Sequence, residues 1–276
     1  MIQPHQADFH VHPDYSIDAK GSIDEYCRSA ISKGLKVICF TTHIDLNPER
    51  EQHDPFMRIN GNVERMTPEY LLAYYNEIKS TQDKYAEKGL TVLAGIELDY
   101  FDGVKEVWEN INPGIQFDYI LGSIHCIDKY AFTWSIEAPV VFEKYPQELF
   151  YEKYYNSVAK LAETGIVDCI GHLDGYRKYA RNSVDDGMNY PPTEKVKEAL
   201  IVIKNSGIGI EINSAANRHG LGGTYPVVSI LELASEIEVP IIALGSDSHI
   251  PSDLGEGFDI STLLIEKYKL RWKPII

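Results

Sequence analysis

Short apolar runs alternate with longer amphipathic segments along most of the chain. Seven of these runs are rich in β-branched residues and lack a clean polar alternation, which is typical of strands buried on both faces of a parallel sheet. The runs cover residues 7–11, 37–41, 92–98, 119–124, 167–171, 208–212 and 241–244. We therefore expect a parallel sheet with helices packed against it.

Segments with helical spacing of apolar residues lie between these runs. Residues 22–25, Ser-Ile-Asp-Glu, form a capping box, and Gly34 is placed to end the helix that follows. Further helices are predicted over residues 68–88, 104–110, 147–164, 193–206, 227–237 and 261–268. Repeated alternation of strand and helix in 276 residues predicts parallel βα units that close into a barrel, with residues 1–276 as one domain.

Four long stretches have no clear periodicity, and each follows the carboxyl end of a predicted strand. They cover residues 47–67, 128–146, 177–192 and 215–226. Loops at this end of a βα barrel form the substrate pocket. We expect these four stretches to be irregular and to form the walls of a pocket.

The excess of acidic residues argues against some classes of binding partner. Lys and Arg total 26 against 41 Asp and Glu, a formal charge of −15, and no basic block is present. Binding of nucleic acid is therefore disfavoured. An acidic protein can still bind a small anionic substrate when bound divalent cations reverse the local field.

The first residues of the chain and its cysteine pattern both argue against export. The first residues form no signal peptide, and no run of about 18 apolar residues occurs. Four scattered cysteines without a Cys-x-x-Cys pair favour reduced thiols over disulfides. We expect a cytoplasmic protein with no membrane partner.

The predicted strand ends carry a set of metal-binding side chains. Six of the nine histidines lie within or just beyond them: His10, His12, His43, His125, His172 and His249. Glu97 and Asp247 also lie at strand ends. A single such histidine is more often a packing residue than a ligand, but six histidines and two acids at one edge of a sheet predict a polynuclear site. Imidazole and carboxylate without thiolate suit zinc, iron or manganese.

Several ordered motifs make the chain resemble the PHP (polymerase and histidinol phosphatase) family. They are His10-x-His12, Thr42-His43, Gly95-Ile96-Glu97, Ser123-Ile124-His125, Gly171-His172 and Ser246-Asp247-Ser248-His249. Gly171-His172-Leu173-Asp174 leading into Arg177-Lys178, together with Glu211-Ile212-Asn213-Ser214 and Tyr225-Pro226, is similar to the histidinol-phosphatase branch. The resemblance implies a single-domain, distorted (β/α)7 TIM-like barrel that holds three divalent metal ions.

The resemblance also implies which residues bind each ion. His10, His12, Glu97 and Asp247 would bind the first ion. Glu97, His125 and His172 would bind the second, and Asp18, His43 and His249 the third. Some relatives have histidine at the position of Asp18, so the third site has a different ligand set here. Asp8 shares the period of His10 and His12 and is a candidate supporting partner or a purely structural residue.

The expected reaction is hydrolysis of L-histidinol phosphate by a hydroxide held between two ions, a step of histidine biosynthesis. Asp18 and Asp247 are candidate proton donors by position, and Arg177, Arg218 and His219 are candidate substrate contacts. An exposed surface side chain is the alternative for each of the last three. Hydrolysis of another small ester, such as a nucleotide or sugar phosphate, and a noncatalytic metal-binding role remain open, as do the metal identity, the proton donor and the oligomeric state.

Overall fold

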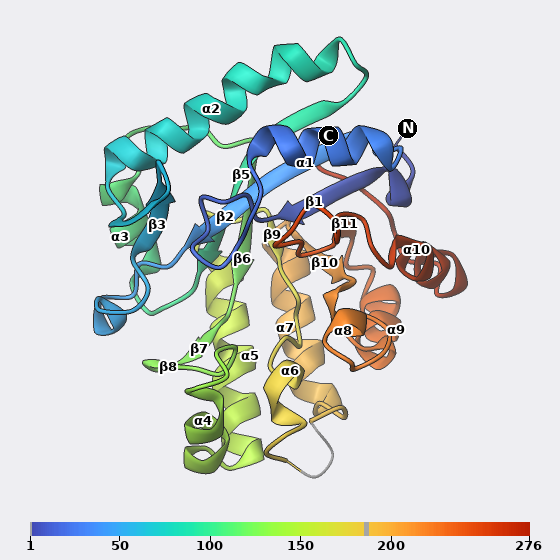
Figure 1. Ribbon diagram of the computed structural model, residues 1–276. Helices are drawn as coiled ribbons and strands as arrows, with labels where there is room; N and C mark the ends of the chain where they lie inside the picture. The colour runs from blue at the N-terminus through green and yellow to red at the C-terminus, as the bar shows by residue number, and fades with distance from the viewer. Residues whose placement is uncertain (1, 185–187) are drawn as a thin grey trace.

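Seven parallel strands form the central sheet of the computed structural model, which describes residues 2–184 and 188–276 (Figure 1). Their order is β1 (Ala7–Val11), β2 (Val37–Ile44), β5 (Thr91–Asp99), β6 (Tyr119–Ser123), β9 (Cys169–Ile170), β10 (Gly209–Asn213) and β11 (Ile241–Gly245). Each strand coincides with a predicted apolar run. The expected parallel sheet is thus confirmed.

Helices cover the outside of this sheet. They are α1 (Ile23–Ser32), α2 (Pro68–Ala86), α3 (Val104–Ile111), α5 (Gln147–Glu163), α7 (Thr193–Asn205), α9 (Val228–Ile237) and α10 (Phe258–Lys267). The capping box is present, because Ser22 accepts from Glu25 N and the Glu25 side chain accepts from Ser22 N. The last helix begins three residues before the predicted Ser261, directly after Gly257, whose φ of 78° suits glycine.

Hydrogen bonds between the first strand and the segment after the last one close the sheet. Asp247 N donates to His10 O, and His12 N donates to Ser248 O, both at 2.9 Å. Val11 and Ser248 form the parallel bridge between these segments. The fold is therefore the expected distorted (β/α)7 TIM-like barrel.

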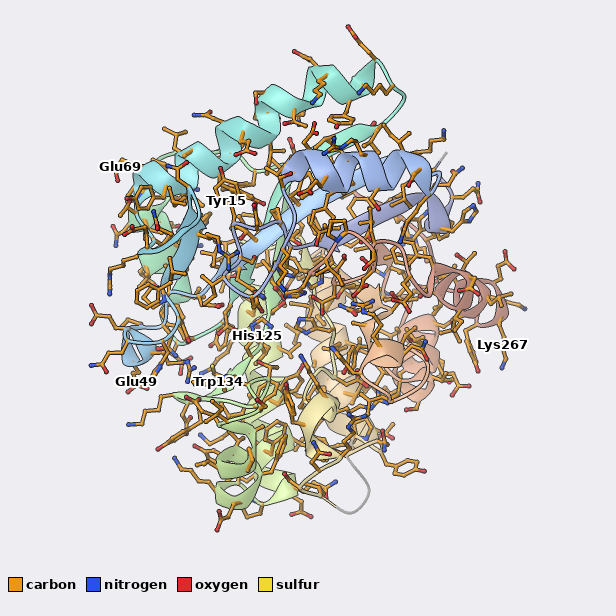
Figure 2. All side chains as sticks on the ribbon, in the orientation of Figure 1. Tyr15, Glu49, Glu69, His125, Trp134 and Lys267 are labelled. Atoms are coloured by element: carbon orange, nitrogen blue, oxygen red, sulfur yellow. The ribbon has the colours of Figure 1, made fainter. Side chains whose placement is uncertain are left out.

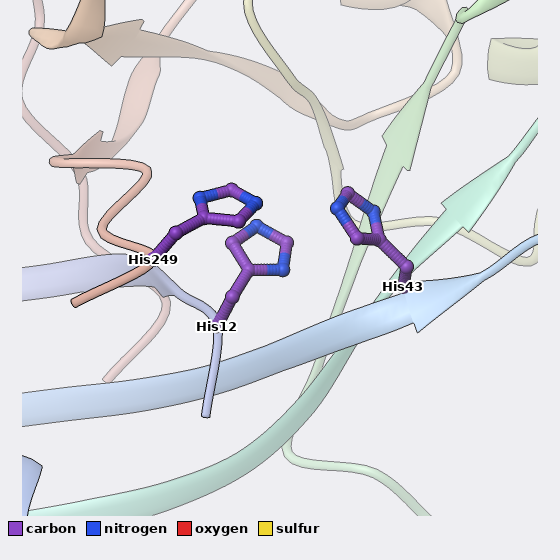
Figure 3. Close-up of side chains that lie close together, drawn as sticks. All are labelled: His12, His43 and His249. Carbon is purple, nitrogen blue, oxygen red and sulfur yellow. The ribbon is translucent and has the colours of Figure 1, made fainter. Parts of the chain in front are cut away.

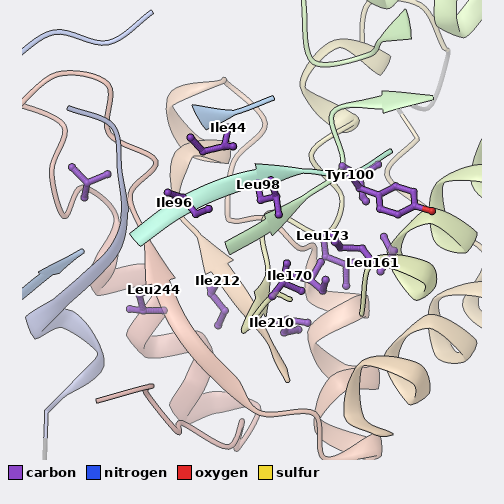
Figure 4. Packing of buried hydrophobic residues seen from close by; sticks show 14 of the residues in the cluster. Ile44, Ile96, Leu98, Tyr100, Leu161, Ile170, Leu173, Ile210, Ile212 and Leu244 are labelled. Atoms are coloured by element: carbon purple, nitrogen blue, oxygen red, sulfur yellow. The ribbon is translucent and has the colours of Figure 1, made fainter. Parts of the chain in front are cut away.

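The barrel interior changes from apolar to polar along its axis. Phe9, Cys39, Tyr119 and Leu121 form part of a buried apolar layer at the amino ends of the strands. A second and larger cluster lies between the sheet and the helices, where Figure 4 shows Ile96, Leu98, Ile170, Ile210, Ile212 and Leu244. The metal-binding candidates come after the apolar layer along the strands. The close packing of that layer holds the strand ends that carry them in place.

The four stretches expected to be irregular contain more structure than predicted. They hold η2 (Pro48–Arg50), β3 (Phe56–Ile59), β4 (Asn62–Arg65), β8 (Tyr130–Ala131), α4 (Ala138–Lys144), α6 (Arg177–Ala180) and α8 (Ala215–Arg218). β8 pairs with β7 (Cys126–Ile127), and η1 (Pro4–Gln6) precedes β1. Residues 185–187 of the 177–192 stretch lie outside the described residues. The β3–β4 hairpin turns at Asn60 and Gly61, both with positive φ, which is the Asn-Gly hairpin signal.

Within the described residues, none of the helices combines the length and apolar character needed to cross a bilayer.

Candidate metal centre

β1 delivers His10 and His12 to the carboxyl end of the barrel, where both side chains are fully buried. The pairing of β1 with β2 shifts register between Asp8 and Val11. Asp8 accepts from Ser246 N and Gly255 N, each at 3.0 Å, and from the backbone N of His10 at 3.3 Å. The predicted shared face of Asp8 with the two histidines is therefore wrong, because the register shift breaks the alternation. Asp8 supports the backbone next to Asp247, as expected of a supporting partner.

Glu97 lies at the centre of the histidine cluster. Its strand β5 pairs with β2 so that Glu97 is opposite His43. Glu97 Oε2 is 3.5 Å from both His10 Nε2 and His12 Nε2, whereas Oε1 is 2.9 Å from His172 Nε2 and 3.5 Å from His125 Nε2. The two carboxylate oxygens thus face different sets of imidazoles. This is the geometry expected of a bridging ligand.

The separations among the first set match a small tetrahedral ion. Asp247 Oδ1 is 3.5 Å from His10 Nε2 and 3.3 Å from His12 Nε2. Donor atoms placed about 2.0–2.1 Å from zinc at tetrahedral corners lie about 3.3–3.4 Å apart. His10 Nε2, His12 Nε2 and Glu97 Oε2 are buried and have no hydrogen-bond partner among the described residues. Buried polar atoms at this spacing fit a divalent cation.

A third group brings together residues from three distant parts of the chain. His12, His43 and His249 have ring nitrogens within 4.8 Å of one another, and Figure 3 shows the three rings side by side. Asp18 Oδ2 lies 3.3 Å from His249 Nε2 and 3.8 Å from His43 Nε2. The structure therefore gathers the three residues expected at the third ion, with His12 beside them.

Arg58 of the hairpin fixes the loop that carries Asp18. Its guanidinium donates to the carbonyl oxygens of Asp14, Ser16 and Ala19 at 2.9–3.0 Å, and also to Ile17 O. One planar side chain thus ties four backbone groups of this loop together. No local pattern predicts this contact, because it joins separate chain segments.

Glu211 of β10 orients two of the histidines from beneath. Its Oε1 accepts from His10 Nδ1 at 2.7 Å, and its Oε2 accepts from His172 N at 2.7 Å. When Nδ1 of His10 carries the proton that it donates to Glu211, the other ring nitrogen, Nε2, is unprotonated and can bind a metal ion. A Cβ on Gly245 would lie 1.8 Å from Glu211 Oε1, so only glycine fits beside this carboxylate.

Replacing Glu211 by glutamine is expected to weaken metal binding about 10- to 100-fold. The amide would replace one acceptor by an NH₂ group that faces an existing N–H donor. Competition with a chelating dye measures the affinity, with Glu232→Gln on the exposed face of α9 as the matched control. Equal affinity in the Glu211 variant and the control would contradict the orienting role.

The charges of the cluster stabilise its ionised carboxylates. Burial alone would raise the pKa of Glu97, but the nearby His10, His43 and His125 hold it well below its usual range. Burial and the neighbouring His249 and His43 hold the pKa of His12 well below its usual range. At His43 and His125 the neighbouring carboxylates, Glu97 first, outweigh burial and raise the pKa to about 10 and about 9. Because a ligating imidazole is neutral, binding of an ion at these two histidines would release protons.

A cavity of about 630 Å³ opens above this cluster. Its lining includes Lys178, His219 and Tyr225 on one side, and Phe56, Trp134 and His53 on another. The expected position of His219 near the substrate fits this lining. Lys178 lines the cavity wall, whereas the sequence predicted Arg177 as the substrate contact there.

The two candidate arginines are occupied elsewhere, and neither is among the described residues that line the cavity. Arg177 is buried and donates to Asp174 Oδ2 at 3.1 Å and to Thr224 O at 3.3 Å. Arg218 Nη2 donates to Ser246 O and Asp247 O at 2.6 and 3.1 Å. These contacts hold the cavity walls and the Asp247 backbone. Direct contact of either arginine with phosphate stays a prediction.

Asp45 and Asp99 line the cavity but were not among the residues predicted to form the site. Asp99 Oδ1 accepts from His125 N at 2.9 Å. Burial, together with the nearby Asp99 carboxylate, raises the pKa of Asp45 to about 7. An acid two residues after each of two ligand candidates was the signal in the sequence.

Comparison with known proteins agrees with the motifs. A family model described as PHP domain matches residues 8–215. The chain belongs to the PHP domain family. This PHP chain is 30% identical over 254 residues to a probable histidinol-phosphatase of Deinococcus radiodurans, covering 91% of this chain and 89% of the relative. It is 24% identical to the histidinol-phosphatase of Bacillus subtilis, covering 91% of this chain and 96% of the relative.

A solved structure shares the fold. It is histidinol phosphate phosphatase from Lactococcus lactis in complex with zinc, L-histidinol and phosphate. The TM-score is 0.74 at 20% identity, and the match covers 97% of this chain and 95% of that one. This likeness supports the distorted barrel.

Proposed function

We propose that this PHP protein is a histidinol-phosphatase, which hydrolyses L-histidinol phosphate to L-histidinol and phosphate in histidine biosynthesis. The observation that carries the proposal is a cluster of buried imidazoles and carboxylates at the floor of a cavity, in a chain that matches histidinol-phosphatases over nine-tenths of its length. We take residues 1–276 as one catalytic domain.

The proposed centre holds three divalent ions, with zinc, iron and manganese as the candidates. His10, His12, Glu97 and Asp247 would hold one ion, Glu97, His125 and His172 would hold a second, and Asp18, His43 and His249 would hold a third. Such ions supply Lewis acidity toward phosphoryl oxygens and a hydroxide nucleophile at neutral pH. Zinc is favoured because the Lactococcus lactis protein was solved with it.

The chain's own groups bind and orient the ester. Lys178 and His219 line the cavity wall and are placed to contact phosphate oxygens. Arg177 and Arg218 hold the walls and the Asp247 backbone, and they remain candidate phosphate contacts. Asp18 and Asp247 remain the candidates by position for proton transfer to the departing alkoxide. The histidines beside them outweigh burial and hold the pKa of both carboxylates well below its usual range, so each would relay a proton from a water molecule rather than carry one itself.

The retained ligand set argues against a noncatalytic role. All nine ligand candidates are present, and the structure gathers them around one cavity floor. A protein that had lost catalysis would be free to lose some of them. The remaining alternative is a PHP phosphoesterase that acts on a nucleotide or a sugar phosphate.

Phosphate release from a panel of esters tests the proposal. We expect kcat/KM for L-histidinol phosphate to exceed that for nucleoside and sugar monophosphates at least about 100-fold, since a site built for a substrate's polar groups rejects esters that leave those groups unpaired. Comparable or greater turnover of another ester would assign the same site to that substrate.

A further inference from the structure

Two carboxylates lie one step beyond the metal-binding residues on the inward face of the barrel. Asp45 follows His43 by two residues, Asp99 follows Glu97 by two, and His43 is paired with Glu97 across β2 and β5. Residues two apart on a strand share a face and are separated by about 6.6 Å. Asp45 and Asp99 therefore form a second acidic tier nearer the cavity mouth.

Other acids of this wall already have a basic partner. Arg50 donates to Glu137 Oε2 at 2.6 Å, and its Nε and Nη2 donate to Asp54. This buried arginine joins the loop after β2 to the segment before α4 and is hydrogen-bonded to both acids.

Asp45 is different. Its side chain has no hydrogen bond or ion pair with any described residue, and its Oδ1 is buried. A buried carboxylate oxygen without a donor is costly, and the cost is removed by a cationic donor that enters from the cavity. Asp45 also lines that cavity, so such a donor can reach it.

We propose that Asp45, with Asp99 beside it, binds the ammonium group of the substrate, so that the enzyme selects phosphate monoesters of vicinal amino alcohols. The inference rests on the proposed function. In L-histidinol phosphate the amine is four bonds from phosphorus, about 4–5 Å with single bonds of about 1.5 Å. A phosphoryl group at the metal tier therefore brings the ammonium to the tier of Asp45.

The outer part of the cavity fits the rest of this substrate. Trp134 and His53 lie with ring centroids 5.9 Å apart, and Phe56 lines the same cavity. Figure 2 shows Trp134 near the β7–β8 hairpin, below His125. Aromatic side chains beyond the acidic tier offer a stacking surface for the imidazole ring of the leaving group.

A metal ion is the competing occupant, because ligand atoms of Asp45, Asp99 and His125 lie within 4.8 Å of one another. The ring of His125 is already engaged on both sides, with Nε2 3.5 Å from Glu97 Oε1 and Nδ1 3.4 Å from Asp99 Oδ1. This arrangement favours His125 as a ligand of the Glu97 site and leaves Asp45 for the substrate.

The test compares L-histidinol phosphate with its deamino analogue, 3-(imidazol-4-yl)propyl phosphate, in the metal-loaded enzyme. We expect Asp45→Asn to lower the ratio of the two kcat/KM values about 10- to 100-fold, the range for a lost hydrogen bond to a charged group. Glu51→Gln removes an exposed charge on the same loop and should leave the ratio at its original value.

The outcomes separate the inference from the proposed function. An unchanged ratio in Asp45→Asn, with both substrates slowed equally, would overturn the ammonium site. Loss of one metal equivalent from the variant, measured by elemental analysis, would make Asp45 a metal ligand and also overturn it. Failure of the unaltered enzyme to hydrolyse L-histidinol phosphate would instead overturn the proposed function.

Discussion

Replacing Glu97 by glutamine is expected to lower kcat at least about 10³-fold and to reduce bound metal by at least one equivalent. Its two oxygens face different groups of histidines, so in the proposed centre the amide would remove a charge that two ions share. Lewis-acid stabilisation is worth several kcal/mol, and about 4 kcal/mol corresponds to about 10³-fold in rate. Steady-state kinetics and elemental analysis of the same preparation measure both effects.

Glu232→Gln is the matched control, because Glu232 is exposed on α9 and the change has the same chemistry. It should retain full activity and metal content. Circular dichroism of the Glu97 variant should match that of the parent, since the apolar layer beneath the site is untouched. A Glu97→Gln enzyme with parental kcat and metal content would refute the bridging assignment.

Removal of metal with a chelator is expected to abolish phosphate release and to lower the melting temperature by several degrees. The buried imidazoles and carboxylates lose the cations that their spacing fits. An ion held at 100 times its dissociation constant contributes about 2.7 kcal/mol to stability, and each kcal/mol is worth about 2–4 °C in a chain of this size class. A thermal melt and a phosphate assay follow the two effects.

Re-addition of Zn²⁺ or Mn²⁺ should restore both properties. Ca²⁺ is the matched control, because it prefers six to eight oxygen ligands and suits an imidazole-rich site poorly. Full activity and an unchanged melting temperature after chelation would mean that the cluster does not need metal.

The strands and most of the cluster could be predicted because they follow local rules. A buried parallel strand is recognised by its continuous apolar run, and the next residues along it must lie at the same end of the sheet. Glu97 lies near the end of such a run, and His125 and His172 directly follow theirs, so all three were found in this way. The hydrogen-bonded register of neighbouring parallel strands then brings these three side chains close together.

The remaining features depend on packing between distant segments. The register shift in β1 breaks the alternation between Asp8 and His10, and no local pattern announces such a shift. Lys178 rather than Arg177 lines the cavity because Asp174 and Thr224 hold the arginine. Asp45 was not among the predicted site residues, because the burial of its Oδ1 depends on chain segments that pack around it.

The most direct test is to titrate metal-free protein with Zn²⁺ or Mn²⁺ while following phosphate release from L-histidinol phosphate. The proposed trinuclear site predicts no release without metal and a plateau near three equivalents per chain. Full release by metal-free protein, or no release at any metal loading, would contradict the assignment of this chain as a metal-dependent histidinol-phosphatase.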